Sequence, residues 1–385
     1  MTTSLFDYQA DAVKKLRTGS ILVGGVGSGK SRTAIAYFFE NERPKDLYII
    51  TTAAKRDTLD WEGEAAQYGL TAKVDSWNRI KEYVKVSGAF FIFDEQRLVG
   101  SGSWVKSFLK IVKNNNWILL SATPGDTWLD YIPVFIANGF YKNRTEFLRR
   151  HVVYNTFTKF PKVDHYVEIG ALKRFKARIL VDMAYRPPVD SSFIDVVSDY
   201  DLERFKLVSE KRWNPYTDLP IKDVTELFFT MRKVVNSDPS RLGALKTIIQ
   251  KHRRVIVFYN FNYELEILRT LKDTGVTVGE YNGYKHDPVP SDARWVYLVQ
   301  YMSGAEGWNC IETNAMVFYS QNYSYRVMTQ AAGRINRLNT TFAHLFYYTL
   351  LSESKIDIAI KKALKNKKKF NERKSGFINF GYKEG

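Results

Sequence analysis

The sequence predicts an α/β protein with two doubly wound parallel-sheet domains in tandem, and three observations indicate this class. First, short apolar runs alternate with segments of helical periodicity in both halves of the chain, as buried parallel strands and their crossover helices do. Second, 385 residues are more than one ordinary core accommodates. Third, a Pro187-Pro188 break lies near the middle of the chain and suits a domain boundary. We therefore expect an N-terminal domain at residues 1–190 and a C-terminal domain at residues 191–385.

The strands are expected where the apolar runs lie. These are residues 21–23, 46–52, 89–93 and 117–120 in the first domain, and 254–259, 295–299 and 315–319 in the second. Helices are expected at 33–39, 265–271 and 326–335. The stretch from 126 to 240 is less regular, with helical patterns at 129–140, 146–153 and 224–235 and a strand-like run at 192–197.

The composition limits the class of partner. The formal net charge is +16, a surplus typical of proteins that bind a polyanion, nucleic acid before membrane, although a merely basic soluble protein is the alternative. A single cysteine, Cys310, excludes an intramolecular disulfide and a multi-cysteine zinc site. The N-terminus lacks the pattern of a signal peptide, and no apolar run approaches the ~18 residues of a membrane span. We therefore expect a soluble, cytoplasmic protein of a reducing compartment, with no membrane partner.

One stretch, Gly24 to Ser31, indicates that the protein binds a nucleotide and is called the P-loop below. Its residues are Gly24, Gly25, Val26, Gly27, Ser28, Gly29, Lys30 and Ser31, the pattern G-x-x-x-x-G-K-[ST] between an apolar strand and a helix. Glycines let the backbone wrap round phosphate oxygens, and the helix N-terminus adds aligned N–H donors. Lys30 can reach the β- and γ-phosphates of a nucleoside triphosphate, and the Ser31 hydroxyl can complete a Mg²⁺ shell. A glycine-rich turn that matches by chance is the alternative.

A second signal is the pair of adjacent acids, Asp94 and Glu95, that ends the apolar run at 89–93. At a strand tip, Asp94 can hold Mg²⁺ through water, and Glu95 can orient and deprotonate an attacking water. A strand followed by an acidic turn is the plainer reading. The run at 117–120 ends in Ser121-Ala122-Thr123 and is stopped by proline.

Polar side chains also mark the end of the run at 46–52, where α/β folds bind ligands. The hydroxyls of Thr51 and Thr52 and the ammonium of Lys55 can contact the phosphates of a nucleic acid strand, or equally cap a helix. The segment 75–79, which includes Ser76, is expected to be a polar turn with an aromatic residue and is ambiguous by itself. Gln9, ahead of the P-loop strand, carries an amide that can bond both edges of an adenine, although such a residue is usually solvated.

The key element of the second domain runs from Gln330 to Arg337. Arg334 and Arg337 stand three residues apart, which places them on one side of the predicted helix. Guanidinium groups stay protonated and suit an arginine-finger role on a γ-phosphate, and from the second domain they act only when the two domains close. An ordinary basic helix is the alternative. The basic run at 361–369 is either a helix or tail close to polyphosphate or a solvated end.

Together and in this order, these motifs resemble a superfamily 2 helicase or translocase. The motifs are Tyr8-Gln9, the P-loop through Ser31, Asp94-Glu95, Ser121-Ala122-Thr123 and Gln330…Gly333-Arg334…Arg337. Within that group the chain looks most like the SWI/SNF-like branch and its compact phage-type, DEAD/DEAH-like relatives. The stretches that carry this finer match are 51–64 with Trp61, 253–268, 303–309 and Ile356-Asp357 before a Lys-rich helix.

The resemblance implies tandem RecA-like domains with an ATP cleft between them, and ATP and Mg²⁺ as cofactors. It implies that Lys30 and Ser31 bind phosphate and Mg²⁺, that Asp94 holds the metal and that Glu95 activates water. Three further roles follow from it by position: adenine contact by Gln9, coupling of the ATP and strand sites by Ser121 and Thr123, and γ-phosphate sensing by Gln330, Arg334 and Arg337.

The same resemblance implies a nucleic acid strand lying across both domains. On the first domain it would touch Thr51, Thr52, Lys55 and the segment with Ser76. On the second, the loop with Ser303, Gly304, Gly307 and Asn309 would link the nucleotide state to the tracked strand. Two departures from the family pattern are Arg97, where His or Asp is usual, and Glu306, where glycine is usual. Neither removes a residue that hydrolysis itself requires.

The predicted function is a nucleic-acid-dependent ATPase motor, a DNA helicase or translocase that moves along or remodels DNA in phage replication or recombination. DNA is favoured over RNA as the partner, and we expect a monomer or weak oligomer in the cytoplasm, that of the host if the protein is viral. The alternatives are an RNA-dependent ATPase or remodeller and an ATP-gated DNA clamp that does not unwind. A signalling P-loop switch is disfavoured, because the two arginines belong to the same chain.

Overall fold

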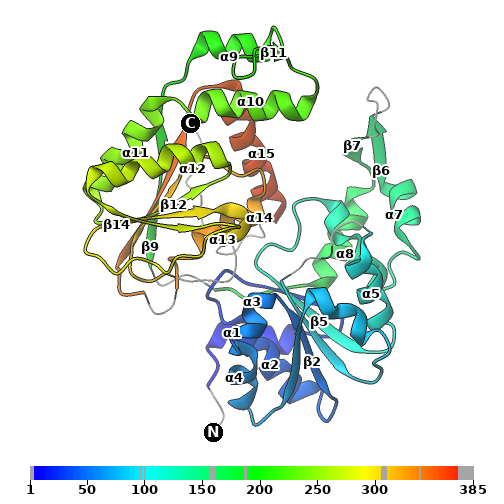
Figure 1. The fold of residues 1–385 in the computed structure, drawn as a ribbon. Helices are drawn as coiled ribbons and strands as arrows, with labels where there is room; N and C mark the ends of the chain where they lie inside the picture. The colour runs from blue at the N-terminus through cyan, green and yellow to red at the C-terminus, as the bar shows by residue number, and fades with distance from the viewer. Residues whose placement is uncertain are drawn as a thin grey trace. The chain divides into compact units, whose positions relative to one another are not determined.

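The computed structural model describes residues 4–95, 98, 101–155, 162–185, 189–304, 310–337 and 340–371. These residues form two compact units, of which the first ends at Tyr185 and the second takes in the described chain from Val189 onward. Each unit is built on one six-stranded sheet (Figure 1). The predicted domain division between residues 190 and 191 falls at the start of the second unit's first strand.

The first unit holds a parallel sheet with the strand order β3-β2-β4-β5-β1-β8. Its strands are β1 Ile21–Val23, β2 Leu47–Thr51, β3 Ala72–Ser76, β4 Phe90–Asp94, β5 Asn116–Ser121 and β8 Leu180–Asp182. The strands β1, β2 and β4 are buried at every position, because helices cover both faces of the sheet. Since all strands run the same way, their carboxyl ends share one edge.

Helices lie on both faces of this first sheet. On one face, α1 (Asp7–Lys15), α2 (Lys30–Asn41) and α4 (Asp60–Ala66) share a core with Leu22, Ile49 and Ile92 (Figure 1). On the other face, Phe108 of α5 (Ser103–Ile111) packs edge-on against Phe93, with ring centroids 5.0 Å apart. The remaining elements are α3 Ala53–Asp57, η1 Trp77–Tyr83, η2 Trp128–Tyr131, α6 Ile132–Ala137, α7 Arg144–His151, β6 Val152–Asn155, β7 Lys162–Tyr166 and α8 Ile169–Ile179.

The second unit holds a parallel sheet with the strand order β13-β14-β12-β15-β16-β9. Its strands are β9 Asp190–Val197, β12 Arg254–Tyr259, β13 Thr277–Tyr281, β14 Trp295–Gln300, β15 Ala315–Phe318 and β16 His344–Leu351. Ile256 and Phe258 of β12 face one core, while Val255 and Val257 face the other. This alternation with both sides buried is the signature of a sheet covered by helices on two faces.

The helices of the second unit divide between the two cores. The first core takes side chains from α9 Leu202–Ser209, α10 Val224–Asn236, α14 Tyr325–Ala332 and α15 Lys355–Asn371, and the second from α11 Pro239–Lys251, α12 Asn262–Arg269 and η3 Thr270–Thr274. A short helix, α13 Tyr301–Gly304, follows β14, and a small hairpin joins β10 Trp213–Asn214 to β11 Leu219–Pro220. Arg241 of α11 is fully buried and ion-pairs with Asp357 of α15.

The predicted fold class is confirmed: the chain forms two doubly wound α/β units with parallel sheets, consistent with RecA-like domains. The ATP cleft between the domains stays a prediction, as does the domain division at residue 190. The basic run at 361–369 is helical, since α15 continues to Asn371. No helix of the described chain is long and apolar enough to cross a membrane.

Three local predictions are wrong. The helix expected at 326–335 ends at Ala332 with Gly333 as its C-cap, so Arg334 and Arg337 follow the helix instead of sharing one of its faces. Glycine favours this stop because it has low helix propensity. The expected polar turn at 75–79 is instead the end of β3 followed by η1, where Trp77 is buried. The helical pattern at 146–153 ends at His151, because the β-branched pair Val152-Val153 begins β6.

Candidate nucleotide and strand site

Three of the sequence motifs meet at the carboxyl edge of the first sheet. The order β4-β5-β1 brings Asp94, Ser121 and the loop after Val23 to neighbouring strand ends. Because β5 lies between them, β1 and β4 are about 10 Å apart.

The P-loop is closely packed, and its glycines are needed. Gly27 and Gly29 have φ values of 82° and 76°, in the left-handed region that favours glycine. A Cβ on Gly24 would come within 2.5 Å of Ser28 Oγ, and one on Gly29 would collide with the side-chain amide of Gln9. The ammonium of Lys30 donates to the carbonyls of Gly24 and Gly25, at 2.8 and 2.9 Å, so the side chain crosses the loop it belongs to. Half-buried Ser31 follows in the first turn of α2.

Gln9 holds the P-loop from the side of α1. It is almost fully buried; its Nε2 donates to Ser28 O at 3.3 Å, and its Oε1 accepts from Phe6 N at 3.0 Å. The hydroxyl of Tyr8 donates to the same Ser28 carbonyl at 3.2 Å. In this arrangement the amide positions the loop backbone, and the adenine contact of Gln9 stays a prediction.

Replacing Gly29 by alanine tests how tightly Gln9 and the loop fit. Gly29→Ala combines left-handed strain with a steric conflict at Gln9, whereas Gly139→Ala carries the same strain (φ 74°) with nothing within 4 Å of the new Cβ. We expect Gly29→Ala to lower the free energy of unfolding by about 1–3 kcal/mol more than Gly139→Ala. Chemical denaturation of both variants measures the difference. Equal losses of unfolding free energy in the two variants would show that the Gln9 side chain moves aside at no energetic cost.

Asp94 is the most heavily bonded acid of this edge. It is 1% exposed, and its Oδ2 accepts from Thr51 Oγ1 at 2.8 Å, Lys55 Nζ at 2.8 Å and Trp61 Nε1 at 3.3 Å. Burial alone would raise the pKa of this carboxyl, but Lys55, the Thr51 hydroxyl and the more distant Lys30 outweigh it, and the pKa is lowered. Asp94 is therefore a fixed anion beside the P-loop.

Glu95 follows directly and has an unusual backbone. Its φ is 60°, in the left-handed region, where a non-glycine residue is strained. Residues with this kind of strain cluster at active sites and ligand clamps, although Leu59, Glu168, Arg212 and Asp218 also have a positive φ in this chain. The turn at Glu95 ends the pairing of β4 with β5, whose last paired residues are Asp94 and Leu120.

The Ser-Ala-Thr segment lies on the strand between the P-loop and the acids. Ser121 Oγ accepts from Thr123 N at 3.1 Å, which fixes the turn after β5. Thr123 Oγ1 is buried and has no hydrogen-bond partner among the described residues. A buried hydroxyl without a partner is uncommon, and here it marks a group that can bond to something that binds at this edge.

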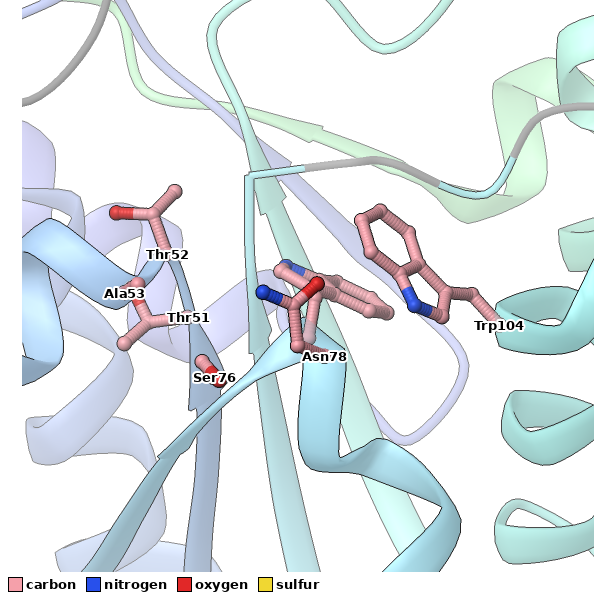
Figure 2. Close-up of a pocket in the computed structure, with 7 residues that line it drawn as sticks. Thr51, Thr52, Ala53, Ser76, Asn78 and Trp104 are labelled. Carbon is pink, nitrogen blue, oxygen red and sulfur yellow. The ribbon is translucent and has the colours of Figure 1, made fainter.

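A cavity of about 180 Å³ lies beside Asp94 at the ends of β2 and β3. It is lined by Thr51, Thr52, Ala53, Ser76, Trp77, Asn78 and Trp104. In Figure 2, Trp104 lies across from Thr52 and Ala53, with Asn78 between them. Trp104 is half-buried and 6.1 Å from the Trp77 ring, whose Nε1 donates to Asp94 O at 2.9 Å. The cavity thus combines an indole face, hydroxyls and an amide.

The four residues predicted to touch a strand have different surroundings. Thr51 is fully buried with its hydroxyl on Asp94, and Lys55 is ion-paired with the same carboxylate. Thr52 Oγ1 accepts from Lys55 N at 3.3 Å and so caps α3, while Ser76 is buried at the end of β3. All but Lys55 line the cavity, and their contact with nucleic acid stays a prediction.

Sequence reasoning missed Trp104, whereas Asn78 falls in the segment 75–79 that the motif resemblance predicted to touch the strand. Trp104 lies at the start of α5, whose buried residues include Val105 and Phe108, and the periodicity of that helix gives Trp104 no special place. Asn78 lies in η1, which was expected to be an irregular turn. The one available signal for Trp104 was a tryptophan in a polar stretch, and without the position of β3 this signal does not indicate a cavity.

The described candidate residues of the second unit lie in two stretches of the chain, 303–304 and 330–337. Ser303 and Gly304 belong to α13, directly after β14. Gln330 is buried on α14, Arg334 is buried in the turn after it and Arg337 is half-buried. The carbonyl of Arg334 accepts from Cys310 N at 3.0 Å. Gly307, Asn309, Glu306 and Arg97 lie outside the described residues.

The residues at the first sheet's edge fit a Mg²⁺–nucleotide. A glycine cradle, a lysine, a hydroxyl at a helix start and one buried anion form the donor set that this ligand uses. No group of three or more His, Cys, Asp or Glu side chains gathers to hold a metal within the described ranges.

The sequence matches no protein-family model and no curated protein. Among solved structures it is similar to the Sulfolobus solfataricus SWI2/SNF2 ATPase core in complex with dsDNA, at a TM-score of 0.41 and 14% identity. The match covers 96% of this chain and 92% of that one. The family that the motifs imply, and its phage-type branch in particular, stays a prediction.

Proposed function

We propose that the protein is an ATP-hydrolysing motor that acts on nucleic acid, a DNA translocase or helicase. One observation carries the proposal: a P-loop and a buried, charge-stabilised aspartate share a sheet edge with a cavity, and two residues that line this cavity are hydrogen-bonded to the aspartate. Thr51 and Trp77 line the cavity, and each donates a hydrogen bond to Asp94. A nucleotide site and a nucleic acid site that are linked through one residue, Asp94, suit an ATPase whose rate of hydrolysis depends on bound nucleic acid.

In the proposed reaction, the chain's own residues bind, orient and accept a proton. Lys30 exchanges the carbonyls of Gly24 and Gly25 for the β- and γ-phosphates of ATP, while the P-loop amides surround the phosphates. Ser31 and Asp94 would hold Mg²⁺, which supplies charge neutralisation on those phosphates when bound. Glu95 accepts the proton of the attacking water.

The second domain contributes the remaining parts of the proposal. Gln330, Arg334 and Arg337 act on the γ-phosphate when the domains close, because guanidinium groups stabilise charge that develops there. Ser303, Gly304 and Gly307 transmit the nucleotide state to the strand, and Ser121 and Thr123 do so from the first domain. The motif resemblance further suggests a minimal motor for phage DNA replication or recombination.

The rate of ATP hydrolysis with different polynucleotides tests the function. The conditions are no polynucleotide, single-stranded DNA, duplex DNA and single-stranded RNA, each with wild type and Arg337→Ala. We expect strong stimulation by DNA that Arg337→Ala removes. Preference for RNA would favour an RNA-dependent remodeller, and duplex binding that requires ATP while DNA leaves the hydrolysis rate unchanged would favour a clamp. A rate that no polynucleotide changes would overturn the motor.

Trp104 gives a prediction specific to the cavity of about 180 Å³ at the ends of β2 and β3, called the strand cavity below. An exposed indole face can stack on a nucleobase, which contributes about 1–3 kcal/mol per base in proteins that bind single strands. We expect Trp104→Ala to weaken binding of a labelled oligothymidine by about 5- to 150-fold, with Trp104→Phe retaining most of the affinity. Fluorescence anisotropy measures both variants.

The control is Trp213→Ala, because Trp213 is also half-buried but lies in the second unit with its Nε1 bonded to Asp218. It should bind the oligonucleotide like wild type. If Trp104→Ala binds as tightly as the control, or Trp104→Phe as poorly as alanine, no base stacks on this indole.

A further inference from the structure

The second unit carries a larger cavity, of about 500 Å³, at the amino ends of its strands. The cavity walls include Arg254, the first residue of β12, and Asn314, which directly precedes β15. Ser303 and Gly304, the candidate coupling residues, follow the carboxyl end of β14 and therefore belong to the opposite edge of the same sheet. None of the residues proposed to handle ATP or the strand lines this cavity.

The lining of the cavity is strongly cationic. Lys251, Arg253 and Arg254 contribute three positive charges against a single acid, Glu312. That acid is already paired, since its carboxylate lies 3.7 Å from Arg254 Nη1. Lys251 and Arg253 are exposed and form no ion pair with any described residue. The lining therefore has a local excess of positive charge that no ion pair with a described residue offsets.

The neutral part of the lining is held in place. His252 is half-buried, with Nε2 2.8 Å from the Tyr348 hydroxyl. Burial, with Lys251 nearby, lowers the pKa of this imidazole and keeps it uncharged. Thr313 Oγ1 donates to the Arg254 carbonyl, and Asn314 Nδ2 donates to the carbonyl of His344 at 3.3 Å. The walls are therefore fixed by their own hydrogen bonds, while the two unpaired cations can reorient toward a ligand.

We propose that this cavity binds phosphate groups, and that their source is the backbone of a nucleic acid at a second contact, on the edge of the second unit's sheet opposite to Ser303 and Gly304. Guanidinium groups bond phosphate oxygens in pairs, and lysine adds a point charge. The volume is within the range of small-ligand sites, so a phosphate with its sugar fits. The net charge of +16 over the chain favours a long polyanion over a free anion.

The test is the salt dependence of oligonucleotide binding. Each phosphate contact adds about 0.7 to the slope of log affinity against log salt concentration for a single strand. We expect the double variant Lys251→Ala/Arg253→Ala to reduce this slope by about 1.4. The charge-preserving variant Lys251→Arg/Arg253→Lys should keep the slope, and so should the matched control Lys211→Ala/Lys222→Ala, which removes two exposed charges elsewhere in the unit.

Two further arms separate the phosphate sources. Titration with ADP and with inorganic phosphate shows whether a free phosphate compound, instead of a nucleic acid backbone, binds the cavity. If the alanine variant loses this binding while the salt-dependence slope of oligonucleotide binding stays unchanged, the cavity is a site for a free phosphate compound. Poly-glutamate of matched charge should not compete. Equal competition by poly-glutamate, or an alanine variant that matches wild type for all probes, would overturn the proposal.

Failure of this phosphate-binding proposal and failure of the proposed ATPase motor would give different results. ATP hydrolysis without polynucleotide should be unchanged in the alanine variant, because Lys251 and Arg253 are outside the nucleotide site. If wild type hydrolyses no ATP but the slope still depends on these two residues, the motor fails and the second contact stands. Circular dichroism and thermal unfolding confirm that each variant is folded.

Discussion

Glu95→Gln is expected to lower the rate of ATP hydrolysis by about 10²- to 10⁴-fold, the usual contribution of a positioned general base. An amide has nearly the size of the carboxylate but cannot accept the proton of the attacking water. The left-handed backbone at Glu95 (φ 60°) imposes similar strain on both side chains, so the fold should be unaffected. The affinity for ATP should therefore stay close to that of wild type.

Single-turnover hydrolysis and equilibrium binding of a fluorescent ATP analogue together measure this effect. The matched control is Glu82→Gln, an acid on η1 that is 52% exposed and pairs with Arg79. It should hydrolyse ATP like wild type. Unchanged turnover in Glu95→Gln would show that another group takes the proton, and a parallel loss of ATP affinity would show that Glu95 acts in binding.

Arg241→Leu is expected to cost the second unit about 3–5 kcal/mol, the range for breaking a buried ion pair by removing one partner. Arg241 is fully buried; it donates to Asp357 Oδ2 at 2.6 Å, to Asn236 Oδ1 at 2.6 Å and to the carbonyl of Tyr319 at 3.2 Å. Without the guanidinium, the side-chain bonds that Asp357 keeps among the described residues come from the backbone and hydroxyl of Ser352. An uncompensated buried charge is the main cost.

The double variant Arg241→Leu/Asp357→Leu should recover part of the loss, because it removes the unpaired carboxylate as well. Native-state hydrogen exchange of the α15 amides is the suitable measurement, since a chain of two units need not unfold in one step. Lys206→Ala, which breaks the exposed pair with Glu203, serves as the control and should leave exchange unchanged. If Arg241→Leu leaves exchange unchanged too, the cluster contributes no net stability.

Much of this architecture was predictable, because parallel strands with both faces covered are continuous apolar runs. The runs that became β1, β2, β4, β12, β14 and β15 are of this kind. The strand β3 was missed because Ala72–Ser76 includes Lys73 and Asp75 and has the mixed composition of an edge. The end of α14 was misplaced because a short basic motif carries no periodicity that marks where a helix stops.

The candidate site was predictable only where a motif is local. The P-loop and the Asp94-Glu95 pair are contiguous in sequence, and the structure places them on one edge. The partners of Asp94 come from other elements: Lys55 lies 39 residues away and Trp61 33 residues away. No pattern in a single sequence links an acid to a lysine or an indole at such a separation. Hence the bonds by which Thr51 and Lys55 stabilise the charge of Asp94 were not foreseen, while their contact with a strand stays a prediction.

The bonds that converge on Asp94 have a thermodynamic consequence. Thr51 and Trp77 donate to its carboxylate and its carbonyl and also line the strand cavity, so a ligand that displaces either changes the energy of the aspartate that faces the P-loop. Linkage between two binding equilibria is reciprocal. For a chain that binds both ligands here, the factor by which an oligonucleotide changes the affinity for nucleotide equals the factor by which nucleotide changes the affinity for the oligonucleotide. Nucleotide binding and strand binding would then share one coupling free energy, which depends on the hydrogen bonds to the carboxylate and the backbone carbonyl of a single aspartate.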